Sequence, residues 1–169
     1  PNTLFYILSS DASKDQLAAN IIEKASREGL GVIVLNFHQK LGFLKEEIVN
    51  LWIRRQSPNI DLSILITIQI ERNWKGRVRL IQVVETSIEK KEASIYLNKL
   101  KNIMRIPFEV EIVVLVGSFK EAMTSAPPAD LNIFGMQQKP NINMIREVSS
   151  NVKTSVLFLR DSEYESALA

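Results

Sequence analysis

The chain has 169 residues, a formal net charge of +2, no cysteine, and hydrophobic residues at 46% of its positions. The absence of cysteine excludes disulfides and thiolate metal sites, and it fits a reducing compartment. The nearly balanced charge argues against a nucleic-acid partner bound through phosphate electrostatics. The apolar fraction is too high for a disordered tail, and the length suits one domain, so we expect a single domain over residues 1–169.

No segment is predicted to cross a membrane. The densest apolar stretch, Ile60–Ile70, is short and interrupted by polar residues, whereas a spanning helix needs about 20 mostly apolar residues. No signal-peptide pattern is present. The sequence begins with Pro1 rather than methionine. We interpret this as an excised fragment in preference to a processed start, and an excised domain can still belong to a membrane protein.

The first elements along the chain are a strand, a helix and a second strand. Thr3–Leu8 and Val32–Phe37 are short apolar runs typical of buried strands. Between them, Ser13 and Gln16 have the spacing of a capping box, and Gly29 is a natural helix stop. One face of the predicted helix carries apolar residues at helical spacing, which are Leu17, Ala18, Ile21, Ile22 and Ala25.

The segment that follows is less regular. Phe43–Glu47 is compatible with a helical turn, and we assign the alternating pattern of Ile48–Arg54 to a strand. Ser57–Asn59 breaks the chain. Ile60–Arg72 is rich in β-branched residues and is a strand by propensity, but its length and the capping residues Asn59 and Asp61 at its start favour a buried helix.

The second half alternates plainly between strands and helices. Strands are predicted at Val78–Val84, Val110–Val116, Leu131–Met136 and Ser155–Arg160. Thr86 and Glu89 form another capping-box pair. The helix after them has one apolar stripe, made by Ala93, Tyr96, Leu97, Leu100, Ile103 and Met104. Ser118–Pro128 is predicted to be a loop with one helical turn, and Asn141–Val148 a helix with Pro140 near its first turn.

This alternation predicts βαβ units and therefore an α/β fold with a mostly parallel, doubly wound, Rossmann-like sheet covered on both faces. In such a sheet a ligand binds beyond the carboxyl ends of the strands, at the point where the strand order reverses. The first β–α loop contains Ser10, Asp11 and Ser13. Their carboxylate and hydroxyls suit a ribose or a metal, but we favour helix capping, which by itself explains the capping-box spacing. The loop lacks the glycines of a dinucleotide site.

Gly135 is the other candidate for a ligand site. The strand Ala129–Gly135 resembles the late strand of universal stress proteins, which in that family leads into a glycine-rich loop around the phosphates of ATP. Here Met136–Asn141 follows, with a proline and no further glycine. Backbone amides cannot crowd around a phosphate in such a loop, so we expect no bound nucleotide and no cofactor.

No set of side chains predicts catalysis or metal binding. His38 is the only histidine, so no Ser-His-Asp set can be assembled. Asp11 and Asp15 fit favourable charges at a helix start, and Trp52 and Trp74 fit packing positions. We therefore expect no enzyme. The basic residues cluster at Arg54, Arg55, Arg72, Lys75, Arg77 and Arg79. A solvated face is the simplest interpretation, and contact with an acidic segment or with lipid headgroups is the alternative.

Seven segments have a characteristic order and spacing: Pro1–Phe5, Ile48–Ile53, Leu62–Ile70, Trp74–Leu80, Ala129–Met136, Ser155–Arg160 and Glu165–Ala169. In this order they resemble the cytosolic C-terminal domain of the cation-chloride cotransporters and of related prokaryotic transporters in the amino acid-polyamine-cation superfamily. In that family a tryptophan-bearing strand precedes an apolar helix, a second tryptophan introduces the next strand, and an Ala-Asp-Leu strand comes near the end.

The resemblance implies a universal-stress-protein-like fold, a helix at Ile60–Arg72, and one lobe, most similar to the second, of a two-lobed domain. It implies a place on the cytoplasmic side of the cell membrane as part of an integral membrane protein. The implied partners are a second copy of the chain, giving a homodimer, and the transmembrane domain of the same transporter. The implied role is regulation and dimerisation, with transport done elsewhere. The alternative is a stand-alone nucleotide-binding protein of the universal stress protein type.

Overall fold

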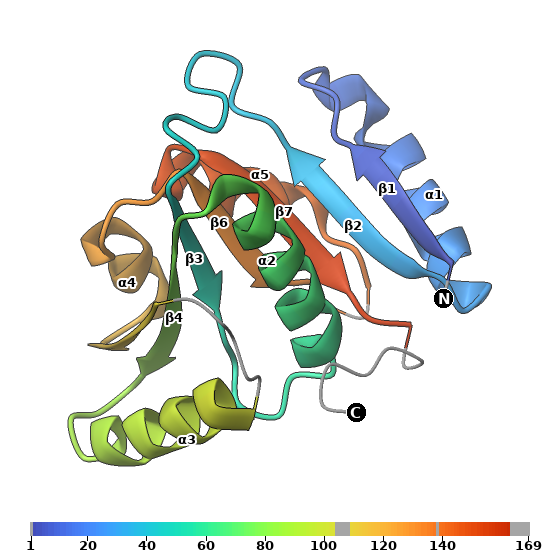
Figure 1. The fold of residues 1–169 in the computed structure, drawn as a ribbon. Helices are drawn as coiled ribbons and strands as arrows, with labels where there is room; N and C mark the ends of the chain where they lie inside the picture. Colours follow the sequence, from blue (N-terminus) through green and yellow to red (C-terminus); the bar gives the residue numbers. More distant parts are fainter. Residues whose placement is uncertain (1, 104–108, 138, 163–169) are drawn as a thin grey trace.

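Seven strands form one sheet in the computed structural model, which describes residues 2–103, 109–137 and 139–162 (Figure 1). The strands are β1 (Thr3–Ile7), β2 (Gly31–Asn36), β3 (Ile48–Trp52), β4 (Arg77–Val84), β5 (Val110–Val116), β6 (Leu131–Gly135) and β7 (Ser155–Arg160). Their order across the sheet is β1-β2-β7-β6-β3-β4-β5. The helices are η1 (Ala12–Lys14), α1 (Asp15–Arg27), α2 (Ile60–Trp74), α3 (Glu89–Ile103), α4 (Phe119–Ser125) and α5 (Ile142–Val152).

The sheet is mostly parallel, as predicted, with one reversal. Strands β3, β4, β5, β6 and β7 all run in the same direction. Strand β2 pairs antiparallel with β7, and β1 pairs parallel with β2. The first β-α-β unit therefore points the opposite way from the rest of the sheet. The carboxyl ends of β1 and β2 lie at one end of the sheet, and those of the other five strands lie at the opposite end.

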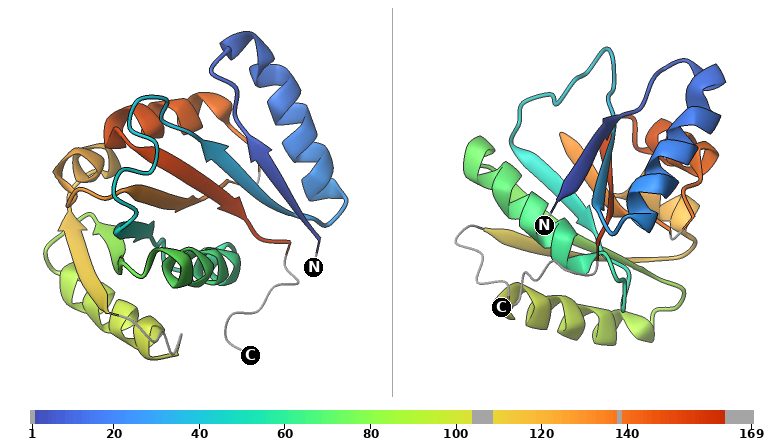
Figure 2. Two further views of the ribbon diagram at one scale, coloured as in Figure 1. Left: turned by 45° about the horizontal axis from the view of Figure 1, so that its top comes forward. Right: turned by 90° about the vertical axis from the view of Figure 1, so that its right-hand side faces the viewer.

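Helices cover both faces of the sheet, which gives three layers (Figure 2). One buried cluster joins α1, α4 and α5 to the sheet and includes Ile22, Ile145 and Phe158. The other joins α2 and α3 to the opposite face and includes Ile64 and Leu97. Because side chains alternate between the faces of a strand, each central strand contributes to both clusters.

Helix α2 settles the ambiguity at Ile60–Arg72 in favour of a helix, as the family resemblance implied. Its buried positions, Leu62, Ser63, Ile64, Thr67 and Glu71, recur at helical rather than strand spacing. The Thr67 hydroxyl donates to the Ser63 carbonyl oxygen at 2.7 Å, so its polar group is satisfied inside the helix. The helix ends at Trp74, and its C-cap Lys75 has a left-handed conformation with φ 55°.

Strand β1 is the main departure from the expected burial. Thr3–Leu8 was predicted to be a buried strand, but β1 alternates between exposed and half-buried residues. The reason is the strand order, which puts β1 at the edge of the sheet. The predicted apolar face of the first helix is only partly correct, since Leu17 is 58% exposed whereas Ala18 and Ile22 are buried.

Two local predictions need correction. The start of α1 has no Ser13–Gln16 capping box; instead Asp11 caps η1 by accepting a hydrogen bond from the Ser13 amide. Ser118–Pro128 is more than a loop with one turn, because it contains α4, which begins with a reciprocal capping box between Ser118 and Glu121.

The remaining local predictions concern the segment before β3, the start of α3 and residues outside the described ranges. Phe43–Glu47 forms irregular turns instead of a helical turn, and Leu44 and Glu46 have positive φ angles of 51° and 59°. The predicted Thr86–Glu89 capping box is half formed: the Glu89 carboxylate accepts from the Thr86 amide at 2.9 Å, but the Glu89 amide donates to the Thr86 carbonyl oxygen instead of the hydroxyl. Pro1, Met104 and Glu165–Ala169 lie outside the described residues.

Candidate functional site

The topological switch point lies between β6 and β3. From β3 the chain passes through α2 to β4, and from β6 it passes through α5 to β7 on the other side. Helices α2 and α5 lie on opposite faces of the sheet. A crevice for a ligand is expected outside the carboxyl ends of these two strands. The candidate Gly135 is the last residue of β6 and therefore stands at this point.

The side chain of Asn59 occupies this crevice. Asn59 immediately precedes α2 and is only 5% exposed. Its Nδ2 donates to the Met136 carbonyl oxygen at 2.7 Å, and its Oδ1 accepts from the Asp161 amide at 3.0 Å. One side-chain amide thus joins the end of β6, the end of β7 and the start of α2. A buried amide with both ends hydrogen-bonded is a specific structural link.

The start of α2 already holds a carboxylate from the same chain. Asp161 Oδ2 accepts a hydrogen bond from the Leu62 amide at 3.1 Å, and Asp161 is 7% exposed. The first amides of a helix attract anions because they lack partners within the helix and lie at the positive end of the helix dipole. Asp161 occupies the kind of position that a phosphate takes in nucleotide-binding α/β folds.

The missing side chain of Gly135 leaves room for this packing. A Cβ atom on Gly135 would lie 3.0 Å from Asn59 Nδ2 and 3.4 Å from Ser57 Oγ. The glycine therefore lets the loop between β3 and α2 approach the end of β6. Its φ is not in the left-handed region that favours glycine, so close approach is the physical reason for a glycine here.

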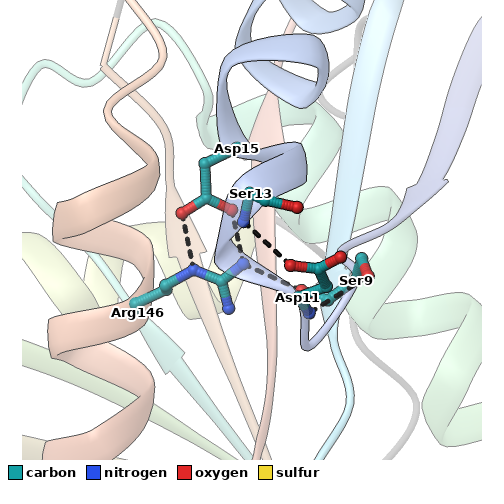
Figure 3. A network of polar contacts seen from close by, with 5 residues as sticks. All are labelled: Ser9, Asp11, Ser13, Asp15 and Arg146. Atoms are coloured by element: carbon teal, nitrogen blue, oxygen red, sulfur yellow. Dashed lines mark hydrogen bonds and ion pairs between the residues drawn. The ribbon is translucent and has the colours of Figure 1, made fainter.

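The first β–α loop is stabilised by its own hydrogen bonds (Figure 3). The Asp11 carboxylate accepts from the Ser13 amide at 2.9 Å, and the Asp11 amide donates to Ser9 Oγ at 3.2 Å. Hydrogen bonds from Ser13 lower the pKa of Asp11. Ser10 and Asp11 are exposed. The geometry is that of a helix cap, in which Asp11 takes the role that the sequence assigned to Ser13.

A bidentate ion pair joins the start of α1 to α5. Arg146 Nε donates to Asp15 Oδ2 at 2.9 Å, and Arg146 Nη2 donates to Asp15 Oδ1 at 2.5 Å (Figure 3). The same Nη2 also donates to the Ser9 carbonyl oxygen at 2.8 Å. The two side chains are 25% and 20% exposed. The hydrogen bonds from Arg146 lower the pKa of Asp15, and the pair fixes the reversed first unit against α5.

The structure does not bring the predicted candidates together. Ile7 in β1 is aligned through Leu35 and Leu157 with Ile133 in β6. Beyond these aligned residues, β1 leads to Ser10, Asp11 and Ser13 at one end of the sheet. Strand β6 runs the other way and leads to Gly135 at the opposite end. The first loop and the end of β6 therefore cannot form one site.

The remaining polar candidates have structural partners. His38 lies in a turn, where its amide donates to Ser155 Oγ at 2.9 Å and its Nδ1 accepts from the Leu41 amide at 3.2 Å. Trp52 donates from Nε1 to Asn132 Oδ1 at 2.8 Å and packs inside the core. Within the described ranges, no group of three or more His, Cys, Asp or Glu residues is arranged to hold a metal ion.

The basic cluster seen in the sequence is divided by the fold. Arg55 follows the carboxyl end of β3, whereas Arg79 lies near the amino end of the parallel strand β4. Arg79 pairs with Glu111 at 2.7 Å, and Arg55 is 3.4 Å from Glu92. These residues therefore do not form one continuous basic face.

Sequence reasoning missed the roles of Asn59, Asp161 and Arg146. The sequence alone indicates only a chain break and a helix cap at Asn59, because its partners Met136 and Asp161 are far away in sequence. The signal that was available is local: an asparagine directly before an apolar helix. No local pattern points to the Arg146–Asp15 pair.

The fold of this chain is shared with universal stress proteins. One from Archaeoglobus fulgidus is 14% identical, with a TM-score of 0.61, over 91% of this chain and 59% of that chain. A universal stress protein in complex with cAMP is 16% identical, with a TM-score of 0.50, over 66% of this chain and 94% of that chain. At these identities the likeness shows the fold alone.

The family is narrower. The family model "Prokaryotic cation-chloride cotransporter, C-terminal domain, 2nd" matches residues 44–168. A crystal structure of the cytoplasmic domain of a prokaryotic cation chloride cotransporter is 30% identical, with a TM-score of 0.91, over 99% of this chain and 67% of that chain. The chain therefore belongs to the family of prokaryotic cation-chloride cotransporter C-terminal domains. A search of curated proteins found no match.

In the part of the chain that the structure describes, no helix has the length and apolar character needed to cross a membrane.

Proposed function

We propose that this chain is a regulatory and dimerisation domain of a cation-chloride cotransporter-like membrane transporter and has no transport or catalytic activity of its own. The observation that carries the proposal is the closed switch point. Asn59 and Asp161 fill, from within the chain, the position where this class of fold binds ligands. Such a domain acts through its surface rather than through a bound nucleotide.

Apolar side chains on the surface support a role in assembly. Several large ones are at least 45% exposed, which are Phe5, Ile7, Leu17, Leu44, Ile88, Ile95, Val116 and Phe119. Two of them, Phe5 and Ile7, are neighbours on one face of β1, and neighbouring exposed apolar side chains mark surfaces that bind another protein. We propose that the partners are a second copy of this chain and the transmembrane domain of the same transporter, at the cytoplasmic side of the membrane.

The alternative is a nucleotide-binding domain of the universal stress protein type. Light scattering over a concentration series, with and without ATP, separates the two functions when thermal unfolding is measured on the same samples. Our proposal expects a dimer or reversible self-association, and no rise in melting temperature with ATP. A clear rise with ATP would favour the nucleotide-binding function. A monomeric mass at every concentration would contradict the role in dimerisation.

A further inference from the structure

A groove lies between the start of α2 and the end of α3, on the face of the sheet that both helices cover (Figure 1). Its volume is about 430 Å³, within the range of about 300–1,000 Å³ that is typical of ligand sites. Most of its lining is apolar and includes Ile60, Leu100 and Ile103. Because Ile103 is 42% exposed, the groove is open to solvent and offers an apolar surface to a ligand.

Lys99 adds a positive charge to the lining of this groove. Its side chain is exposed, and no described residue forms an ion pair with it. The groove also contains Asp61, which lies in the first turn of α2, where the helix dipole favours a negative charge. The groove therefore suits a ligand that is mainly apolar and carries an acidic group at the end near Lys99.

After β7 the chain leads to the rim of this groove. Asp161 accepts a hydrogen bond from the Leu62 amide at 3.1 Å, and Leu62 is next to the groove residue Asp61. Residues 163–169 follow almost directly. The family model matches residues 44–168, so nearly all of this segment belongs to the sequence that the model describes. Extended, its seven residues span up to about 23–25 Å, which is ample for a groove of this volume.

The sequence of this segment has the chemistry that the groove requires. It carries a large aromatic residue, Tyr164, between Glu163 and Glu165. In an extended chain successive side chains point to opposite sides, so the tyrosine can enter the groove while the glutamates stay near its rim. A tyrosine buries a large apolar area and keeps its hydroxyl available for a hydrogen bond.

We propose that residues 163–169 bind in the groove between α2 and α3. Tyr164 would pack against the apolar lining, and one of the two glutamates would pair with Lys99. Exposed ion pairs contribute little, so the tyrosine is expected to supply most of the binding. The contact would join α3 to α2 and would hold Asp161 in the switch point, since the segment continues from it. This inference does not depend on the proposed regulatory function and can fail without it.

A spin label tests the proposal on the intact chain. The chain has no cysteine, so Ala169→Cys provides a single site for a nitroxide. We expect the amide signals of Ile60, Lys99 and Ile103 to lose most of their intensity in NMR spectra and to regain it when the nitroxide is reduced. A control label at Thr124→Cys, an exposed position on α4 at the other face of the sheet, should leave these signals sharp. Sharp groove signals with the first label would overturn the proposal.

Variants of the labelled chain separate binding from simple tethering. Tyr164→Ser should restore most of the lost intensity, and Lys99→Glu a smaller part of it. The matched control is Lys91→Glu, the same charge reversal at an exposed position of the same helix, which should restore none. Broadening that persists in Tyr164→Ser would show that tethering alone brings the label near the groove, and the proposal would fail. It would also fail if a nitroxide on one copy broadened the groove signals of another copy in a mixed sample, because the segment would then bind to a second chain.

Discussion

Replacement of Asn59 by alanine tests whether this side chain closes the switch point. The change removes the hydrogen bonds to the Met136 carbonyl oxygen and from the Asp161 amide, at 2.7 and 3.0 Å. All three residues are less than 9% exposed, so water does not readily replace the lost bonds. At about 1–2 kcal/mol for each buried bond, the free energy of unfolding should fall by about 2–4 kcal/mol.

Urea unfolding, followed by circular dichroism, measures this loss. The matched control is Asn73→Ala in the last turn of the same helix. The Asn73 side chain is exposed and donates to the Gln69 carbonyl oxygen at 2.7 Å, so its loss should change the free energy of unfolding by no more than about 0.5 kcal/mol. If Asn59→Ala is as stable as this control, the reasoning about the switch point is refuted.

A second substitution at the same site should depend on the first. Gly135→Ala would place a Cβ 3.0 Å from Asn59 Nδ2, and such crowding typically costs about 1–3 kcal/mol. The cost should be smaller in the Asn59→Ala background, because the crowded atom is absent there. Strict additivity of the two changes in a double-mutant cycle would show that the two side-chain positions do not press on each other.

Three further predictions concern other positions. Gly76→Ala should cost about 3 kcal/mol or more in urea unfolding, because its Cβ would lie 2.0 Å from the Glu47 carbonyl oxygen; near-wild-type stability would contradict this backbone contact. Ser118→Ala should cost about 1 kcal/mol, through the loss of the cap of α4, and an unchanged unfolding midpoint would show that the cap is not stabilising. Arg146 lowers the pKa of Asp15, so their pair stabilises the fold above about pH 4 and this contribution is lost as the pH falls through the folded-state pKa. Arg146→Met should therefore be less stable than the wild type at about pH 6, with a gap that closes in acid; a gap independent of pH would contradict the ion-pair account.

Much of the fold could be predicted from local patterns. The strand predicted at Ser155–Arg160 coincides with β7, and that at Val110–Val116 coincides with β5. The helix at Ile60–Arg72 required more than propensity, because its β-branched residues suit a strand as well. Its length and its place in the family resemblance favoured the helix, which is what the structure has.

Features that depend on strand order could not be predicted. An apolar run such as Thr3–Leu8 fits a buried strand and an edge strand equally well, and its exposure depends on which strands lie beside it. The reversed direction of β1 and β2 has no local signal either. It separates Ser10 and Asp11 from Gly135, which a uniformly parallel sheet would place at the same end.

The candidate site shows the same limit. The loop after Gly135 lacks the glycines of a phosphate site, and this can be read directly from the neighbouring residues in the sequence. The filling of the crevice depends on contacts between Asn59 and residues about a hundred positions away, such as Asp161. Such contacts exist only once the ends of β6, β7 and the start of α2 have been brought together.

The central claim is that this domain controls a transporter without carrying ions itself. The most direct measurement is ion flux into vesicles that contain the complete transporter. It is compared with the flux through the same transporter from which the 169 residues of this chain have been removed. Our account predicts that the shortened protein still transports the same ion, at a changed rate and with weaker dimerisation. An unchanged rate and an unchanged dimer would contradict a regulatory role, and a change in which ion is carried would contradict the separation of regulation from transport.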